Sequence, residues 1–150
     1  MGHDVLVRAR AMVYPLLVAC MAVTGLAGAA LAFQAIDGIN VDPAIITSGK
    51  PALVRVTVRV APDPDLIRTG VNLFTCDESG KPLKAIFYMF DDGTHGDKAA
   101  GDGVFTMDLI VSREPPGTYY LRASASYRGQ ATRVLSRVAP FTIVDPGTPR

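Results

Sequence analysis

Aspartate and glycine are concentrated in the segment DDGTHGDKAAGDG, residues 91–103. The aspartates are Asp91, Asp92, Asp97 and Asp102, and a glycine directly precedes each of the last two. Hard cations such as Ca²⁺ are bound by several oxygen ligands, which carboxylates and turn carbonyls can supply. The sequence therefore makes Asp91, Asp92, Asp97 and Asp102 the candidate ligands of a calcium site in this loop.

The same composition has a second explanation that needs no ion. Glycine adopts positive φ without steric cost, and an aspartate side chain accepts hydrogen bonds from backbone amides two residues further on. A loop built this way turns tightly and satisfies its own polar groups. The spacing also differs from an EF-hand, because it lacks Asp-x-Asp-x-Asp-Gly and the glutamate at position twelve. We therefore expect a structural turn without a cofactor, and keep calcium as the alternative.

Catalysis would require a partner for His95, which stands among these aspartates. A His–Asp pair can serve as a general base, but the chain has no Gly-x-Ser-x-Gly motif to supply a nucleophile. Asp91 and Asp92 are neighbours, and neighbours on a strand point to opposite faces, which argues against the paired carboxylates of a glycosidase. The sequence therefore predicts no catalytic residue and no enzyme.

The segment that precedes the domain predicts export. Arg8 and Arg10 are followed by a run without charge from Ala11 to Ile36, and the run contains Ala30-Leu31-Ala32. A basic start, an apolar run and a small-x-small ending are typical of a secretory signal. We therefore expect residues 1–32 to be a signal peptide.

Two other fates of this segment stay open. The apolar run is longer than the roughly 20 residues that a bilayer span needs, so an uncleaved anchor helix is one alternative. The sequence Leu17-Val18-Ala19-Cys20 is similar to a bacterial lipobox, which would place a lipid on Cys20. In each case the domain is exported, to the periplasm or the cell exterior, and it meets a membrane only through this segment.

The segments on either side of the acidic segment are predicted to be β-strands. Residues 33–145 contain runs with the two-residue apolar alternation of half-buried strands, most clearly Ala52–Val60 and Tyr119–Tyr127. The connections are too short for crossover helices. About seven strands at this spacing predict an all-β, antiparallel, immunoglobulin-like sandwich, with residues 146–150 as a tail.

The alternation also predicts which residues of single strands face the core. A first strand is expected near Ile36 to Ile45. The run before the acidic segment is expected to turn one face inward, formed by Leu83, Ala85, Phe87 and Met89. Four aromatic residues would then lie on faces opposite the core, where they are candidates for binding a saccharide: Phe74, Tyr88, Phe90 and Tyr120.

Charge and cysteine content narrow the classes of partner. The 150-residue chain has a formal net charge of +1, and removal of residues 1–32 leaves a formally neutral domain, so no nucleic-acid partner is implied.

Cys76 would be the single cysteine after cleavage, which excludes an intrachain disulfide. We expect Cys76 to be a small side chain at a strand end.

Several segments together resemble a known family. Arg55–Leu66, Val71–Phe74, Asp77–Lys81 and the acidic segment are similar to the secreted bacterial choice-of-anchor X domain proteins, and the resemblance extends over Ile36 to Val144. It implies an exported Ig-like domain that occurs beside varied cell-surface anchors, without enzymatic activity. We therefore expect a non-catalytic structural or interaction module with a protein or glycan partner. The alternative is a ligand-binding module for calcium or a saccharide.

Overall fold

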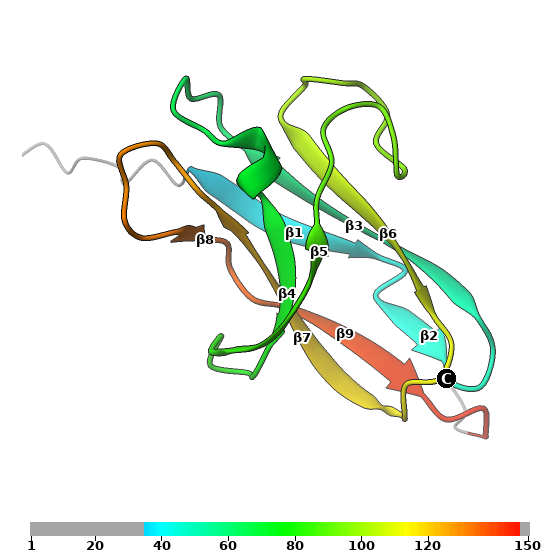
Figure 1. Ribbon diagram of the computed structural model, residues 1–150. Helices are drawn as coiled ribbons and strands as arrows, with labels where there is room; N and C mark the ends of the chain where they lie inside the picture. The colour runs from blue at the N-terminus through cyan, green and yellow to red at the C-terminus, as the bar shows by residue number, and fades with distance from the viewer. Residues whose placement is uncertain (1–34, 148–150) are drawn as a thin grey trace, which may run out of the picture. The chain divides into compact units, whose positions relative to one another are not determined.

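The computed structural model describes residues 35–147, except for the side chains of Ala85 and Ile86. The expected signal or anchor at residues 1–32, Cys20 and the last residues of the tail lie outside this part. Figure 1 shows its elements in chain order: β1 (Ile36–Asp42), β2 (Ile45–Thr47), β3 (Ala52–Val60), the 3₁₀ helix η1 (Arg68–Gly70), β4 (Asn72–Cys76), β5 (Pro82–Tyr88), β6 (Val104–Val111), β7 (Gly117–Ala125), β8 (Val134–Leu135) and β9 (Ala139–Val144). No helix among these elements is long and apolar enough to span a membrane.

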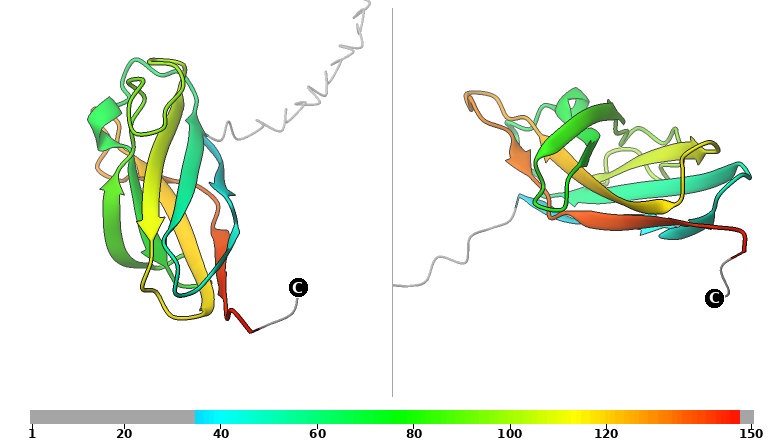
Figure 2. Two further views of the ribbon diagram at one scale, coloured as in Figure 1. Left: turned by 90° about the vertical axis from the view of Figure 1, so that its right-hand side faces the viewer. Right: turned by 90° about the horizontal axis from the view of Figure 1, so that it is seen from below.

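The strands form two facing sheets (Figures 1 and 2). One sheet has the order β1-β3-β6, and the other has the order β2-β9-β7-β4-β5, with β8 added beside β7. The predicted all-β, immunoglobulin-like sandwich is confirmed. The structure has nine strands in the described part, more than the seven expected, because β2 and β8 are only three and two residues long.

Strand β3 shows why the alternation predicts the fold. Its inward positions are all valine and are almost fully buried: Val54, Val56, Val58 and Val60. They face buried residues of the other sheet, among them Leu121 and Ala123 of β7. Each buried valine stabilises the fold by about 1.5–3 kcal/mol relative to an exposed one. The two sheets are therefore held together chiefly by apolar contact.

The expected first strand is two strands in different sheets. β1 pairs with β3 in antiparallel register, whereas β2 pairs with β9 in the other sheet and runs parallel to it. The prediction of purely antiparallel pairing is therefore wrong at this edge. Pro43 has no N–H to donate, so β1 ends before it and the chain crosses to the other sheet. There β2 lies beside β9, a strand from the other end of the chain, and short connections within the chain do not constrain the direction of such a pair.

The expected core face of β5 is only partly correct. Met89 is buried, but Leu83 is 68% exposed and Phe87 is 52% exposed. β5 is an edge strand that pairs only with β4, and the register between them shifts between Leu73 and Phe74. A shift of one residue turns side chains to the other face. Phe74, which alternation had placed outside the core, is also buried.

A tyrosine at the start of β7 fastens the turn before it. The Tyr119 hydroxyl donates a hydrogen bond to the Pro115 carbonyl oxygen at 2.8 Å, and the Tyr119 ring lies against Phe141. The β6–β7 connection thus has the tyrosine corner that is common in immunoglobulin-like sandwiches. The only local signal of this corner in the sequence is a tyrosine shortly after Pro115-Pro116-Gly117.

We expect Tyr119→Phe to lower the free energy of unfolding by about 1 kcal/mol, because it deletes one hydrogen bond and keeps the ring. Urea unfolding measures the change. Tyr120→Phe is the matched control, because the Tyr120 hydroxyl has no hydrogen-bond partner among the described residues. Equal effects of the two substitutions would show that the bond to Pro115 does not stabilise the turn.

Candidate functional site

Residues 91–103, called the acidic loop from here on, connect β5 to β6. The loop lies at the same end of the sandwich as the β3–β4 connection with η1 (Figure 1). Its base is closed by a pair of backbone hydrogen bonds, in which the Phe90 N–H donates to the Thr106 carbonyl and the Thr106 N–H donates to the Phe90 carbonyl. The loop therefore leaves and rejoins the fold at neighbouring points.

Asp91 is the centre of this loop. Its side chain is 2% exposed. Oδ1 accepts the N–H groups of Gly101 at 2.8 Å and Asp102 at 3.1 Å, and Oδ2 accepts the Gly103 N–H at 3.3 Å. Three successive backbone N–H groups that converge in this way form an anion-binding nest. The Asp91 carboxylate occupies that nest and thereby ties the start of the loop to its end.

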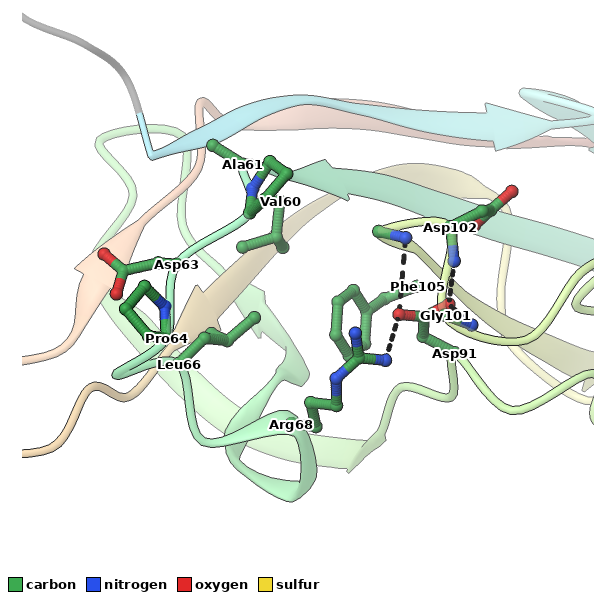
Figure 3. A pocket seen from close by; sticks show the side chains of 12 residues that line it. Val60, Ala61, Asp63, Pro64, Leu66, Arg68, Asp91, Gly101, Asp102 and Phe105 are labelled. Carbon is green, nitrogen blue, oxygen red and sulfur yellow. Dashed lines mark hydrogen bonds and ion pairs between the residues drawn. The ribbon is translucent and has the colours of Figure 1, made fainter.

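Arg68 of η1 supplies a fourth donor. Its Nη1 lies 2.9 Å from Asp91 Oδ2, and Figure 3 shows the guanidinium beside the carboxylate with Phe105 behind them. An ionised carboxylate has about four lone-pair sites, so these four donors occupy Asp91 fully. Arg68 was not among the predicted site residues, because it is 23 residues from Asp91 and no local pattern marks the pair.

The other three aspartates stabilise turns inside the loop. Asp92 Oδ1 accepts the Thr94 N–H at 2.9 Å, and Asp102 Oδ1 accepts the Val104 N–H at 2.8 Å. These are the bonds to an amide two residues further on that the sequence predicted. Asp97 Oδ2 instead accepts the N–H of Gly93, an earlier residue, at 2.7 Å. The Thr94 hydroxyl is the main cause of a lowered pKa at Asp92.

Three of the four predicted ligands come together. Asp91, Asp97 and Asp102 each offer a carboxylate oxygen, and these oxygens lie within 4.8 Å of one another. Asp92 is exposed and outside this group. The arrangement is compatible with a bound cation. Of the four predicted residues, however, Asp91 has both its oxygens already occupied by protein donors.

His95 is held as a turn residue. It has a positive φ of 54°, and its ring stacks on Phe90 with the centroids 3.8 Å apart. Its Nδ1 lies 2.6 Å from the Thr94 hydroxyl. The side chain is exposed. These contacts engage the ring with an aromatic face and a hydroxyl of the same loop, and they account for its position without a catalytic role.

The tip of the acidic loop rests on β6. Gly96 lies so close to Asp108 that a Cβ at Gly96 would be 2.5 Å from Asp108 Oδ2. Asp108 accepts hydrogen bonds from Nε and Nη2 of Arg55, both at 2.8 Å. This bidentate pair joins β6 to β3 under the loop. The bond from Arg55 holds the pKa of Asp108 below its usual value.

The Asp108 pair predicts a pH dependence of stability. The pKa of Asp108 is lowered in the folded state, so its contribution is complete above the unfolded value of about 3.9 and is lost as pH falls through the folded pKa. We expect Asp108→Asn to be less stable than the wild type at pH 6, and the difference to shrink below about pH 4. Urea unfolding between pH 2 and 6 measures it. A difference that stays constant over this range would contradict the linkage.

Two hollows flank the Arg68–Asp91 pair. One has a volume of about 350 Å³ and is lined chiefly by the end of β3, the segment that follows it and the end of the acidic loop (Figure 3). The other has a volume of about 460 Å³ and lies on the side of β5. Both are within the size range of small-molecule sites, roughly 300–1,000 Å³.

Cys76 does not line either of these hollows. It is buried at the end of β4, and burial is the main cause of a raised pKa of its thiol. Because the thiolate is the reactive form, this cysteine is unsuited to nucleophilic chemistry. It acts as the small buried side chain that the sequence predicted.

Part of the chain matches a family of immunoglobulin-like domains. Residues 73–139, which include the acidic loop, match the family described as conditioned medium factor second Ig-like domain. Among solved structures, the chain is similar to the CARDB domain of a Pyrococcus furiosus protein in complex with di-metal ions, with 12% identity, a TM-score of 0.43, and coverage of 73% of this chain and 85% of that one. No curated protein matches the chain. The family match and the sandwich together support an immunoglobulin-like domain, and the choice-of-anchor X resemblance stays a prediction.

Proposed function

We propose that this protein is an exported, non-catalytic immunoglobulin-like module that acts as a structural or interaction domain in the periplasm or outside the cell. The observation that carries the proposal is the use of the acidic loop. Asp91, one of its two buried aspartates, accepts hydrogen bonds from three backbone N–H groups and from Arg68. A carboxylate with no free acceptor site holds a loop in shape and does not act as a base.

The remaining groups of the loop support the same proposal. His95 stacks on Phe90, and Asp97 is bonded to the Gly93 N–H. The hydroxyl beside His95 belongs to Thr94, and it also donates to Asp92 Oδ1 within the same turn. These contacts hold the turn, and none of them requires a catalytic role for His95. A rigid loop on a sandwich is instead a suitable surface for recognition.

Export is tested by the N-terminal residue of the protein recovered from its host. We expect a chain that begins at Phe33 in the periplasmic or extracellular fraction. A lipid-modified chain that begins at Cys20, or an intact chain in the membrane, would still be exported. An intact chain in the soluble cytoplasm would contradict the proposal.

Calcium binding is a second candidate, favoured by the convergence of Asp91, Asp97 and Asp102. We nevertheless expect the same Tm in EDTA and in millimolar Ca²⁺, because Asp91 is occupied by protein donors. Thermal unfolding followed by circular dichroism measures this. If calcium binds the folded protein, linkage raises the Tm with calcium concentration. That rise should then vanish in Asp97→Asn and persist in Asp92→Asn.

A further inference from the structure

The larger hollow combines an exposed aromatic side chain with charges of both signs. It is lined by Arg68 and Thr69 from η1, by Tyr88, Met89 and Phe90 from β5 and the residues after it, by Asp91 and Asp92, and by Phe105 of β6. Of these residues, Met89 and Phe105 are buried, whereas Tyr88 is 64% exposed. We refer to it as the Tyr88 hollow. We propose that the Tyr88 hollow binds a neutral saccharide. This inference rests on the proposed role as an interaction module, and it names the chemical class of the partner.

The aromatic wall is the first argument. Tyr88 follows Phe87 on the edge strand β5, which pairs only with β4. A large aromatic side chain exposed beside a hollow is a typical anchor for a ligand. The C–H face of a sugar ring is apolar and flat enough to pack on such a ring, and its hydroxyls remain at the rim of the ring for hydrogen bonding.

The polar groups of the hollow are the second argument. Asp92 uses Oδ1 for Thr94, and Oδ2 accepts no hydrogen bond from the described residues. Arg68 uses Nη1 for Asp91, whereas its Nε and Nη2 donate to no described residue. A carboxylate accepts from hydroxyls and a guanidinium donates to them. The hollow therefore offers a hydrogen-bond acceptor and a hydrogen-bond donor to the neighbouring hydroxyls of a sugar.

The charges of the hollow favour a neutral saccharide over an acidic one. Its lining holds Arg68 together with Asp91 and Asp92, and Asp91 is already paired with Arg68. A phosphate or an acidic glycan would therefore be repelled by Asp92. A neutral saccharide avoids this repulsion.

The test uses the purified full chain and two assays. The first is affinity electrophoresis with the neutral polysaccharides hydroxyethyl cellulose, xylan, glucomannan and laminarin, and the second is an array of neutral and acidic oligosaccharides. We expect at least one to bind. Tyr88→Ala should weaken its affinity about tenfold or more, as for loss of an aromatic anchor. Asp92→Asn should also weaken it, while the Asn oxygen keeps the turn with Thr94.

Phe87→Ala is the matched control. Phe87 precedes Tyr88 on the same strand and is exposed to a similar degree, but it does not line the hollow. Its substitution should leave affinity unchanged. Thermal unfolding should show that all three variants fold, since each changes an exposed side chain.

Three results would overturn the proposal: no binding to any neutral glycan, binding to acidic glycans alone, or equal losses in Tyr88→Ala and Phe87→Ala. The last result would assign binding to the edge of β5 and not to the hollow. None of these results depends on where the protein resides, so the test is independent of the test for export.

Discussion

Asp91→Ala is expected to lower the free energy of unfolding by about 3–5 kcal/mol, because it removes three backbone hydrogen bonds to a buried charged carboxylate, each worth about 1.5–3 kcal/mol. The ion pair with Arg68 adds little, because the Arg68 side chain is 59% exposed. The substitution leaves the N–H groups of Gly101 to Gly103 without their acceptor and leaves Arg68 without its counterion. Domains of this size are stable by about 5–15 kcal/mol, so the loss is a large part of the total. Urea unfolding at pH 7 measures it.

Asp92→Ala is the control for this prediction. Asp92 is adjacent in sequence and also acidic, but it is exposed and bonds only to Thr94. Its removal should cost about 1 kcal/mol or less, the usual range for an exposed polar contact. If the two substitutions cost the same, the nest around Asp91 is not what holds the loop.

Gly103→Ala is expected to have the second largest effect, a loss of about 2–4 kcal/mol in the free energy of unfolding. Gly103 has φ +79°, and a Cβ there would lie 2.9 Å from the Val60 carbonyl oxygen. That oxygen is backbone of β3 and cannot move aside. Gly103 also accepts the Val60 N–H and donates to Asp91, so a shift of Gly103 would strain both bonds.

Gly101→Ala separates the steric clash with β3 from the strain of a left-handed backbone. Gly101 has nearly the same φ, +80°, but the nearest atom to its added Cβ is Arg68 Nη1 at 3.8 Å. It should therefore cost only the left-handed backbone strain, about 1–2 kcal/mol. Urea unfolding of both variants gives the difference directly. Equal losses would mean that the contact between Gly103 and β3 does not limit the loop.

Local patterns predicted much of the sandwich. The valines of Ala52–Val60 all face the core, because a single strand paired on both sides keeps its alternation along its whole length. β5 did not follow its pattern, because its edge position and shifted register are properties of the sheet and not of the run itself. β2 was missed for a similar reason, since its partner β9 lies at the other end of the chain.

The sequence predicted which residues make up most of the candidate site, but not how they are arranged in space. Turn bonds at Asp92 and Asp102 are local, and the sequence predicted them. The difference between Asp91 and Asp92 in burial agrees with neighbours pointing to opposite sides. Arg68 reaches Asp91 only because η1 and the acidic loop lie at one end of the fold. Such a contact has no periodicity or spacing that a sequence could reveal.

The Arg68–Asp91 pair links the stability of the loop to the proposed binding site. Arg68 lines both hollows and holds Asp91 in the nest, so the wall of the Tyr88 hollow is positioned by the same contact that closes the loop. Loss of Asp91 should therefore impair any binding in this hollow indirectly. This is why the binding test uses the exposed residues Tyr88 and Asp92.

The most direct test of the central claim is amide hydrogen exchange at Gly101, Asp102 and Gly103, measured by NMR in the presence of EDTA. If the Asp91 carboxylate closes the acidic loop without an ion, these three N–H groups should be protected in the wild type and exchange rapidly in Asp91→Ala. Rapid exchange in the wild type, with protection appearing only after calcium is added, would contradict the account.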